Sequence, residues 1–234
     1  MIPDGILFDL DNTLAHRDLG IASYAGRFAQ DFGTRLVDTD AAAIAALIVE
    51  RDNGGYGVVG SPFATLREDI AAALAERLRW HEPATPAELL DHWIAQFPLH
   101  AVEMPGASAV LDRLGAMGIA IGIVSNGAES SRRELVQRLG FDRRIRTLVS
   151  SERAGARKPD ALIFELAARE LGVPADRCWF VGDHPVNDIQ GAHAAGMRAI
   201  WLAGFHRWPD DGVATTTTIS ALSELEPLLS FTSA

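Results

Sequence analysis

The sequence predicts an α/β protein with a parallel sheet, and two observations support this prediction. Short apolar runs of strand length recur along the chain, at residues 5–8, 119–124, 147–149, 178–181 and 198–202. Amphipathic stretches with helix signals lie between most of these runs. Strands that alternate with helices are typical of a parallel sheet whose faces are covered by the helices.

The first strand is predicted at residues 5–8, Gly-Ile-Leu-Phe, because this apolar run stops abruptly at Asp9. Helices are predicted at residues 107–117, 129–139, 160–171 and 189–195, and each is closely followed by a glycine: Gly118, Gly140, Gly172 and Gly196. Glycine suits the left-handed backbone conformation that ends many helices. The four threonines at residues 215–218 are expected to form a strand end or a surface loop.

A long segment between the first two strands, residues 15–103, lacks the alternation of a strand. Helices are predicted there at residues 21–32, 39–50, 62–80 and 85–96, the last with a capping box of Thr85 and Glu88 and with Pro86 in its first position. A glycine-rich loop at residues 53–57 interrupts the segment. We therefore predict a Rossmann-like, doubly wound core of residues 1–14 and 104–234, and an all-α domain of residues 15–103.

Composition and charge exclude several classes of protein. The 234 residues are 48% hydrophobic and 22% charged, which is ordinary for a globular chain. The net charge of −10 argues against a nucleic acid polymer or an anionic membrane as partner. The single cysteine, Cys178, cannot form an internal disulfide. No apolar run approaches a membrane span of about 20 residues, and the N-terminus lacks a basic signal region, so we expect a cytoplasmic protein.

Two acidic clusters follow predicted strands. Asp9 and Asp11 come directly after the first strand, and a second cluster at residues 182–188 contains Asp183 and Asp188. In a parallel sheet both clusters lie at the carboxyl edge, where their mutual repulsion needs a cation. Oxygen ligands without cysteine favour Mg²⁺ over zinc or copper, and Mg²⁺ commonly works beside phosphate oxygens. Either cluster alone could be a turn with a helix cap, but the two together predict a magnesium site.

Two further residues are placed to bind a phosphate group at the same edge. Ser125 follows the second apolar run and precedes a helix, where a hydroxyl and free backbone N–H groups can hold an anion. Lys158 lies just before Pro159 and the next helix, where its charge can neutralise a phosphoryl group or a nucleophilic carboxylate. Taken alone, such a serine is more often a helix cap and such a lysine a surface charge.

Four motifs along the chain resemble, in their order, those of the haloacid dehalogenase-like hydrolase superfamily. The motifs are Asp-Leu-Asp-Asn-Thr at residues 9–13, Ser125, Lys158 and the acidic cluster at residues 182–188, and each begins where an apolar run ends. The resemblance spans most of the chain. It implies that the helical insertion is a C1-type cap domain, which closes over the active site and selects the substrate.

The resemblance also implies a role for each acidic residue. Asp9 would be the nucleophile that attacks phosphorus and forms an aspartyl phosphate. Asp11 would act as general acid and then as general base. Mg²⁺ would be held by the Asp9 side chain, the backbone carbonyl of Asp11 and Asp183. Asn187 or Asp188 would contact the ion or order its water molecules, although Asp188 could equally be only the cap of the helix predicted near residue 189.

The phosphate-binding residues follow from the same resemblance. Ser125 and Lys158 would hold the phosphoryl oxygens, with Lys158 also serving catalysis beside the nucleophile, and Thr13 and Asn126 would be supporting donors. The carboxylate of Asp11 favours phosphate esters over carbon–halogen bonds, because halogen-cleaving members of the superfamily generally lack a carboxylate at that position.

Three other residues have weaker indications of function. Arg51 and Tyr56, beside the glycine-rich loop, could contact a substrate from the cap, although a solvated helix face explains the arginine equally well. His184, next to Asp183, is expected to line the pocket or to make hydrogen bonds at a helix end rather than to bind the metal ion.

We expect a Mg²⁺-dependent phosphatase that acts on a small phosphorylated metabolite, such as a sugar, nucleotide or short acid phosphate. A phosphomutase is the alternative, because it shares the nucleophile and the acid. A haloacid dehalogenase and a phospho-aspartate signalling module are more remote, and the long insertion argues against the latter. No residue pattern fixes the substrate, the pathway, or the choice between monomer and homodimer.

Overall fold

The computed structural model describes residues 2–210 and 217–230. The chain divides into two compact units, one made of Met1–Ala15 with Glu103–Ala234 and the other of His16–Val102. The predicted boundaries, at residues 14/15 and 103/104, differ from these by one residue each. We call the first unit the core and the second the helical unit.

The core is built on a parallel sheet whose strands lie in the order β3-β2-β1-β4-β5-β6. The strands are β1 (Gly5–Phe8), β2 (Ala120–Ser125), β3 (Thr147–Ser150), β4 (Cys178–Gly182), β5 (Arg198–Leu202) and β6 (Thr217–Ile219). From β1 the chain winds outward through β2 and β3, and then returns to β4 on the other side of β1. This reversal confirms the doubly wound fold and creates a switch point at the carboxyl ends of β1 and β4, where ligands bind in such sheets.

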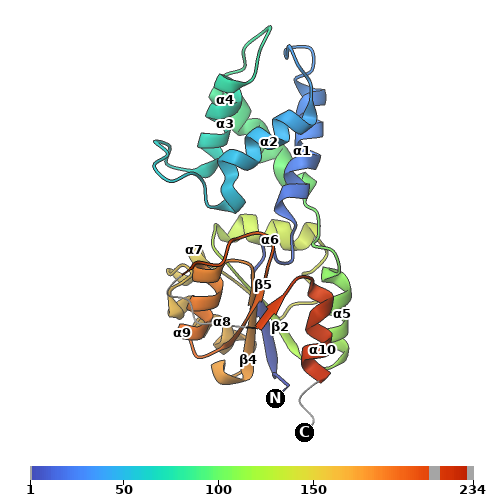
Figure 1. Ribbon diagram of the computed structural model, residues 1–234, viewed down its shortest axis with the longest axis vertical. Helices are drawn as coiled ribbons and strands as arrows, with labels where there is room; N and C mark the ends of the chain where they lie inside the picture. Colours follow the sequence, from blue (N-terminus) through green and yellow to red (C-terminus); the bar gives the residue numbers. More distant parts are fainter. Residues whose placement is uncertain (1, 211–216, 231–234) are drawn as a thin grey trace. The chain divides into compact units, whose positions relative to one another are not determined.

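Helices cover both faces of the sheet because alternate strand residues point to opposite sides. Ile6 and Phe8 pack with helices α5, α6 and α10, whereas Leu7 packs with α8 and α9. Figure 1 shows α5 and α10 on one side of the sheet and α8 and α9 on the other. The core helices are α5 (Ala107–Ala116), α6 (Glu129–Arg138), α7 (Ser151–Ala154), α8 (Ala161–Leu171), α9 (Gly191–Ala194) and α10 (Leu225–Ser230), with short turns η3 (Ala175–Arg177), η4 (Pro185–Gln190) and η5 (Leu222–Glu224).

Most predicted elements of the core appear within one or two residues of their predicted ends. The four glycines expected to end helices all have positive φ angles, from 71° to 77°. The helix predicted at residues 189–195 corresponds to α9 (Gly191–Ala194), and the π-helical turn Pro185–Gln190 that precedes it was not predicted. Thr217 and Thr218 begin strand β6, and residues 215 and 216 lie outside the described residues.

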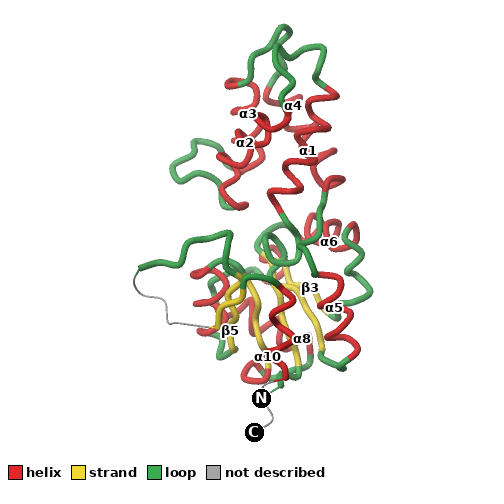
Figure 2. Tube along the Cα trace, turned by 45° about the vertical axis from the view of Figure 1, so that its right-hand side comes forward, coloured by secondary structure: helices red, strands yellow, loops and turns green. Residues whose placement is uncertain are grey.

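The helical unit, all of whose residues are described, contains helices and loops without a strand (Figure 2). Its helices are α1 (Arg17–Asp31), α2 (Ala41–Asp52), α3 (Leu66–Arg77) and α4 (Pro86–Gln96), with 3₁₀ turns η1 (Asn53–Gly55) and η2 (Phe97–His100). Their apolar faces form a separate buried cluster that includes Tyr24, Phe28 and Trp93. The unit therefore has a hydrophobic core of its own.

The helix starts in this unit differ from the prediction. Helix α1 begins at Arg17 rather than at residue 21, where His16 caps it, and α2 begins at Ala41 rather than at residue 39, after its cap Asp40. Helix α3 begins at Leu66 rather than at residue 62, because Thr65 and Glu68 form a reciprocal capping box. At α4 only half of the predicted box is present. Thr85 accepts a hydrogen bond from the backbone N–H of Glu88, while the Glu88 carboxylate instead pairs with Arg35.

Candidate active site

The carboxyl ends of the central strands bring the predicted motifs together. Phe8, the last residue of β1, lies opposite Ile123 of β2 and Val181 of β4. Asp9 directly follows, and its backbone N–H donates to the carbonyl of Val181 at 2.9 Å. Because Ser125 ends β2 and Asp183 follows β4, these side chains start from neighbouring points on one edge of the sheet.

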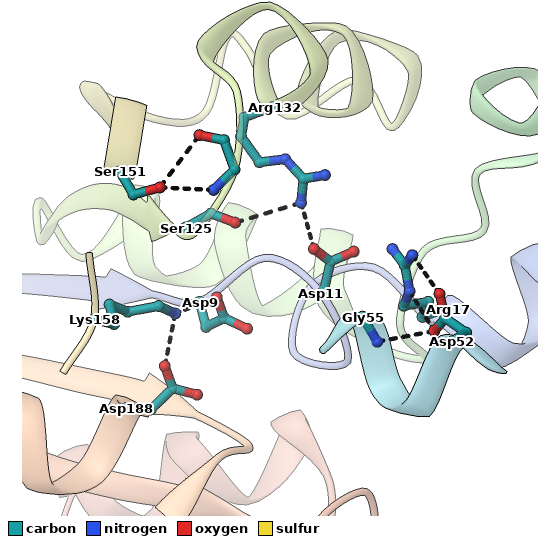
Figure 3. A network of polar contacts seen from close by, with 11 residues as sticks. Asp9, Asp11, Arg17, Asp52, Gly55, Ser125, Arg132, Ser151, Lys158 and Asp188 are labelled. Carbon is teal, nitrogen blue, oxygen red and sulfur yellow. Dashed lines mark hydrogen bonds and ion pairs between the residues drawn. The ribbon is translucent and has the colours of Figure 1, made fainter. Parts of the chain in front are cut away.

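A buried lysine joins two of the predicted aspartates. The Lys158 ammonium nitrogen Nζ lies 2.5 Å from Oδ1 of Asp9 and 2.6 Å from Oδ1 of Asp188. All three residues are at least 96% buried. Figure 3 shows the lysine side chain reaching toward both carboxylates. One positive charge thus faces two carboxylates that are almost fully buried, which makes each charge costly to leave unpaired.

Asn126 holds the backbone of this lysine in place. The backbone N–H of Lys158 donates to the Asn126 side-chain oxygen at 2.9 Å, and the Asn126 amide donates to the Lys158 carbonyl at 3.2 Å. These two bonds attach the loop before α8 to the end of β2. In this structure Asn126 therefore positions Lys158, and its expected role as a supporting phosphate donor stays a prediction.

Three carboxylates form a group that could hold a metal ion. Asp9, Asp183 and Asp188 each place one oxygen within 4.8 Å of the other two. Oδ2 of Asp183 is buried and accepts no hydrogen bond from any described residue, although His206 Nε2 lies 3.4 Å away. Buried oxygens that lack hydrogen-bond donors suit a hard divalent cation such as Mg²⁺. The donor set therefore fits the predicted metal ion.

Burial and mutual repulsion raise the pKa values of these acids. Desolvation raises the pKa of Asp9 to about 7; Lys158 opposes the rise, and Asp188 and Asp11 add to it. Desolvation likewise raises the pKa of Asp183 well above its ordinary value, reinforced by Asp188 and Asp9. The three acids thus share one lysine, and their full ionisation is unfavourable without a further cation. A divalent cation bound there would favour the ionised carboxylates.

Asp188 belongs to this cluster and does not cap the neighbouring helix. Its second oxygen, Oδ2, accepts the backbone N–H of His184 at 2.9 Å. The capping position is taken by His184, whose Nδ1 accepts the N–H groups of Val186 and Asn187. Burial, reinforced by nearby His206, lowers the pKa of His184 to about 4, which keeps the ring neutral and able to accept these bonds. His184 therefore makes hydrogen bonds at a helix end, one of its two predicted roles.

Asp11 lies on a different side of the site from the three clustered carboxylates. Its Oδ2 makes a short ion pair with Nη1 of Arg132, a residue of α6. The same nitrogen lies 3.5 Å from the hydroxyl of Ser125 (Figure 3). Sequence reasoning missed Arg132. Helix α6 follows the Ser125 loop closely enough to suggest such a contact, but Arg132 and Arg133 are adjacent and the sequence alone does not tell which one turns inward.

The other predicted site residues differ in how the structure uses them. Thr13 is fully buried, and its hydroxyl has no hydrogen-bond partner among the described residues. Arg51 binds both carboxylate oxygens of Asp69 at 2.6 and 2.8 Å, so it has a structural partner within the helical unit. Tyr56 follows η1 and is 41% exposed. Substrate contacts by Arg51 and Tyr56 stay a prediction.

Comparison with known proteins identifies the family. The sequence profile of the haloacid dehalogenase-like hydrolases matches residues 3–196. The chain belongs to this family, which confirms the predicted resemblance and the prediction that the protein is a hydrolase. Within the described residues, no helix has both the length and the apolar character that crossing a membrane requires.

Relatives that match nearly the whole chain include a nucleotidase and a phosphatase. The pyrimidine 5'-nucleotidase YjjG of Escherichia coli K12 is 31% identical over 233 residues, which are 97% of each chain. A phosphoglycolate phosphatase of Rhodospirillum rubrum is 30% identical and covers 98% of this chain and 92% of its own.

A solved structure supports the fold. The HAD-hydrolase YfnB from Bacillus subtilis, bound to magnesium, has a TM-score of 0.72 at 20% identity over 98% of this chain and 99% of that one. At this level of identity the likeness shows the fold alone.

Proposed function

We propose that this hydrolase is a Mg²⁺-dependent phosphatase that cleaves small phosphate monoesters through an aspartyl phosphate on Asp9. The observation that carries the proposal is the buried cluster of Asp9, Asp183, Asp188 and Lys158 at the carboxyl edge of the sheet. Such a cluster offers a carboxylate nucleophile, a fixed positive charge and oxygen ligands for a cation. These are the components that phosphoryl transfer requires.

In the first step, a carboxylate oxygen of Asp9 attacks phosphorus, and the bond from phosphorus to the ester oxygen breaks. The proton of Asp11 passes to the departing oxygen, so the product leaves as an alcohol. In the second step, Asp11 accepts a proton from a water molecule whose oxygen attacks phosphorus, and the bond to Asp9 breaks. Inorganic phosphate leaves and Asp9 is regenerated.

The remaining residues of the site would bind the phosphoryl group and the cation. Lys158 is already paired with Asp9, so its charge lies where the phosphoryl oxygens gather during attack. The hydroxyl of Ser125 would donate to one of those oxygens. Asp9, Asp183 and Asp188 would hold Mg²⁺ together with the Asp11 carbonyl. When bound, the ion would neutralise the charge of the phosphoryl group and so make attack by an anionic carboxylate possible.

Small metabolites are the substrate class that we propose. The two relatives similar over nearly their full length are named for a nucleotide and for the phosphate ester of a short acid. We also propose that the helical unit is the cap that selects the substrate, because the chain enters it at His16, soon after the loop that carries Asp11. Cap residues of a closed pocket can exclude large substrates and water.

Phosphate release from a panel of phosphorylated metabolites tests this proposal. We expect wild-type protein to release phosphate with Mg²⁺ and not with EDTA, and the Asp9→Asn variant to be inactive. The matched control is Asp176→Asn, which removes an exposed aspartate of the same unit and should leave activity unchanged. An isomeric phosphate without free phosphate would identify a mutase instead. Turnover that survives Asp9→Asn would disprove the aspartyl-phosphate route.

A further inference from the structure

Arg132 is a charged side chain at the phosphate-binding edge of the core that no motif explains. Its Nη1 pairs with Oδ2 of Asp11 and lies 3.5 Å from Oγ of Ser125. One guanidinium thus connects the expected proton donor with the expected phosphate-binding hydroxyl, although the two residues come from the loop after β1 and from the end of β2. Figure 3 shows the side chain extending from α6 toward both.

Several features of the structure fix this arginine in place. Its side chain is only 15% exposed, and the Asp11 side chain is 21% exposed. The guanidinium passes directly over Gly127, where an added Cβ would lie 3.0 Å from Nε of Arg132. Gly127 also has φ +144°, a conformation that favours glycine. Ser151 holds the backbone of Gly127 at 2.9 Å. The loop after β2 is therefore shaped to let this side chain pass.

The neighbouring arginine shows how an ordinary helix charge behaves on the same element. Arg133 pairs with Glu129 one turn earlier, and its side chain is 57% exposed. The Glu129 side chain is 22% exposed and also pairs with Arg153, so Glu129 does not depend on Arg133 alone. Arg132 has the same charge and the same helix, yet its partner is a carboxylate 121 positions away in sequence. The two arginines therefore differ in the direction in which their side chains leave the helix and in how deeply they are buried.

We propose that Arg132 is a positioning residue that holds the Asp11 carboxylate beside the phosphoryl group for proton transfer. A proton donor works only when it lies within hydrogen-bond reach of the leaving oxygen, and a small displacement is costly. Arg132 fixes the position of Asp11 relative to Ser125, which itself would contact the phosphoryl group. This inference rests on the proposed phosphatase function.

The proposal makes a prediction that depends on the leaving group. An alkyl phosphate needs a proton on its departing oxygen, whereas p-nitrophenyl phosphate releases a stable anion without one. We expect Arg132→Ala to lower kcat about 10- to 100-fold on the alkyl phosphate that the wild type hydrolyses fastest, and less than about threefold on p-nitrophenyl phosphate. KM for both should change little, because the residue does not hold the phosphoryl group. Arg132→Lys should recover part of the loss.

Two further variants separate positioning from other roles. Arg133→Ala is the matched control and should behave as the wild type. In an Asp11→Asn background, Arg132→Ala should cause no further loss, because a residue that acts through Asp11 has no effect once that carboxylate is gone. A merely structural role would lower the unfolding midpoint of Arg132→Ala and reduce turnover of both esters equally.

Three results would overturn the inference. An equal loss on both esters that persists without Asp11 would make Arg132 a direct ligand of the phosphoryl group. Faster turnover of the alkyl ester would mean that the arginine restrains the acid. If Arg132→Ala and Arg133→Ala had the same kcat on both esters, Arg132 would have no role in catalysis. Each of these results requires an active wild type. If the proposed function is wrong, neither the wild type nor any variant releases phosphate, and that outcome is distinct from all three.

Discussion

The two units of this protein bury charged side chains in different ways. In the helical unit, the buried carboxylates of Asp52 and Asp69 are each bound by one arginine. Arg17 reaches both oxygens of Asp52 at 2.6 and 2.7 Å, and Asp52 also accepts the backbone N–H of Gly55. Each of these sites is electrically balanced and has its hydrogen bonds filled.

In the core, the charges are not balanced. Among the described residues, the buried carboxylates Asp9, Asp183 and Asp188 share one buried lysine. Desolvation raises the pKa values of Asp9 and Asp183, and repulsion from the neighbouring carboxylates adds to the rise. Burial of charge alone therefore does not mark a functional site. A buried group in which carboxylates outnumber cationic side chains is the better indication of a functional site.

The largest effect that we expect comes from the nucleophile. Asp9→Asn keeps the size of the side chain but removes the attacking oxygen anion, so phosphate release should fall by about 10³-fold or more. Thermal unfolding of the same variant should show an intact fold. If Asp52→Asn, which removes a balanced carboxylate, reduced phosphate release as strongly in a folded protein, the distinction between the two units would fail.

Stability should respond with opposite sign in the two units. Asp52→Asn leaves the buried guanidinium of Arg17 without its anion, and we expect a loss of about 3 kcal/mol in the free energy of unfolding. Asp183→Asn removes a carboxylate whose ionisation is opposed by burial and by Asp188, so without metal it should raise that free energy at a pH high enough to ionise Asp183. Urea unfolding in EDTA measures both. A loss of similar size in both variants would contradict the comparison.

The pH dependence of the metal-free protein provides a third test. Because folding raises the pKa of Asp9 to about 7 and that of Asp183 in the same direction, the folded chain binds more protons than the unfolded chain between about pH 4 and 7. Stability should therefore fall as pH rises through this window, on the order of 2 kcal/mol. Asp9→Asn should flatten the profile. Stability that increases from pH 5 to 7 in EDTA would show that the carboxylates are already neutralised.

The smallest effect is expected at a surface pair of the helical unit. Glu50 and Arg77 are paired at 2.7 Å, but their side chains are 55% and 47% exposed. Water and salt screen such a pair. Glu50→Gln should leave the urea midpoint within experimental error, and a clear shift would show that balance matters even at exposed sites.

The sequence predicted the parts of the site that depend on strand ends. Asp9, Ser125 and Asp183 follow short apolar runs, and the carboxyl ends of parallel strands meet at one edge, so their proximity needed no knowledge of side-chain packing. For His184, a hydrogen-bonding role at a helix end was one of the two roles expected. Local order along the chain was sufficient in these cases.

Contacts between distant helices could not be predicted in the same way. The pairing of Arg132 with Asp11, and of Arg51 with Asp69, depends on which face each helix turns inward. A single sequence with several arginines on one helix does not fix this. The start of α3 shows a different error, since the capping box at Thr65 and Glu68 was readable in the sequence but the helix was predicted to begin at residue 62.

Titration of Mg²⁺ into the whole protein at pH 8, followed by calorimetry, tests most directly the claim that the unbalanced charge is a cation site. The account predicts one binding event in the wild type, its loss in Asp183→Asn, and wild-type binding in Asp69→Asn, which changes a balanced carboxylate of the helical unit. The absence of binding to the wild type, or equal binding by Asp183→Asn, would contradict it.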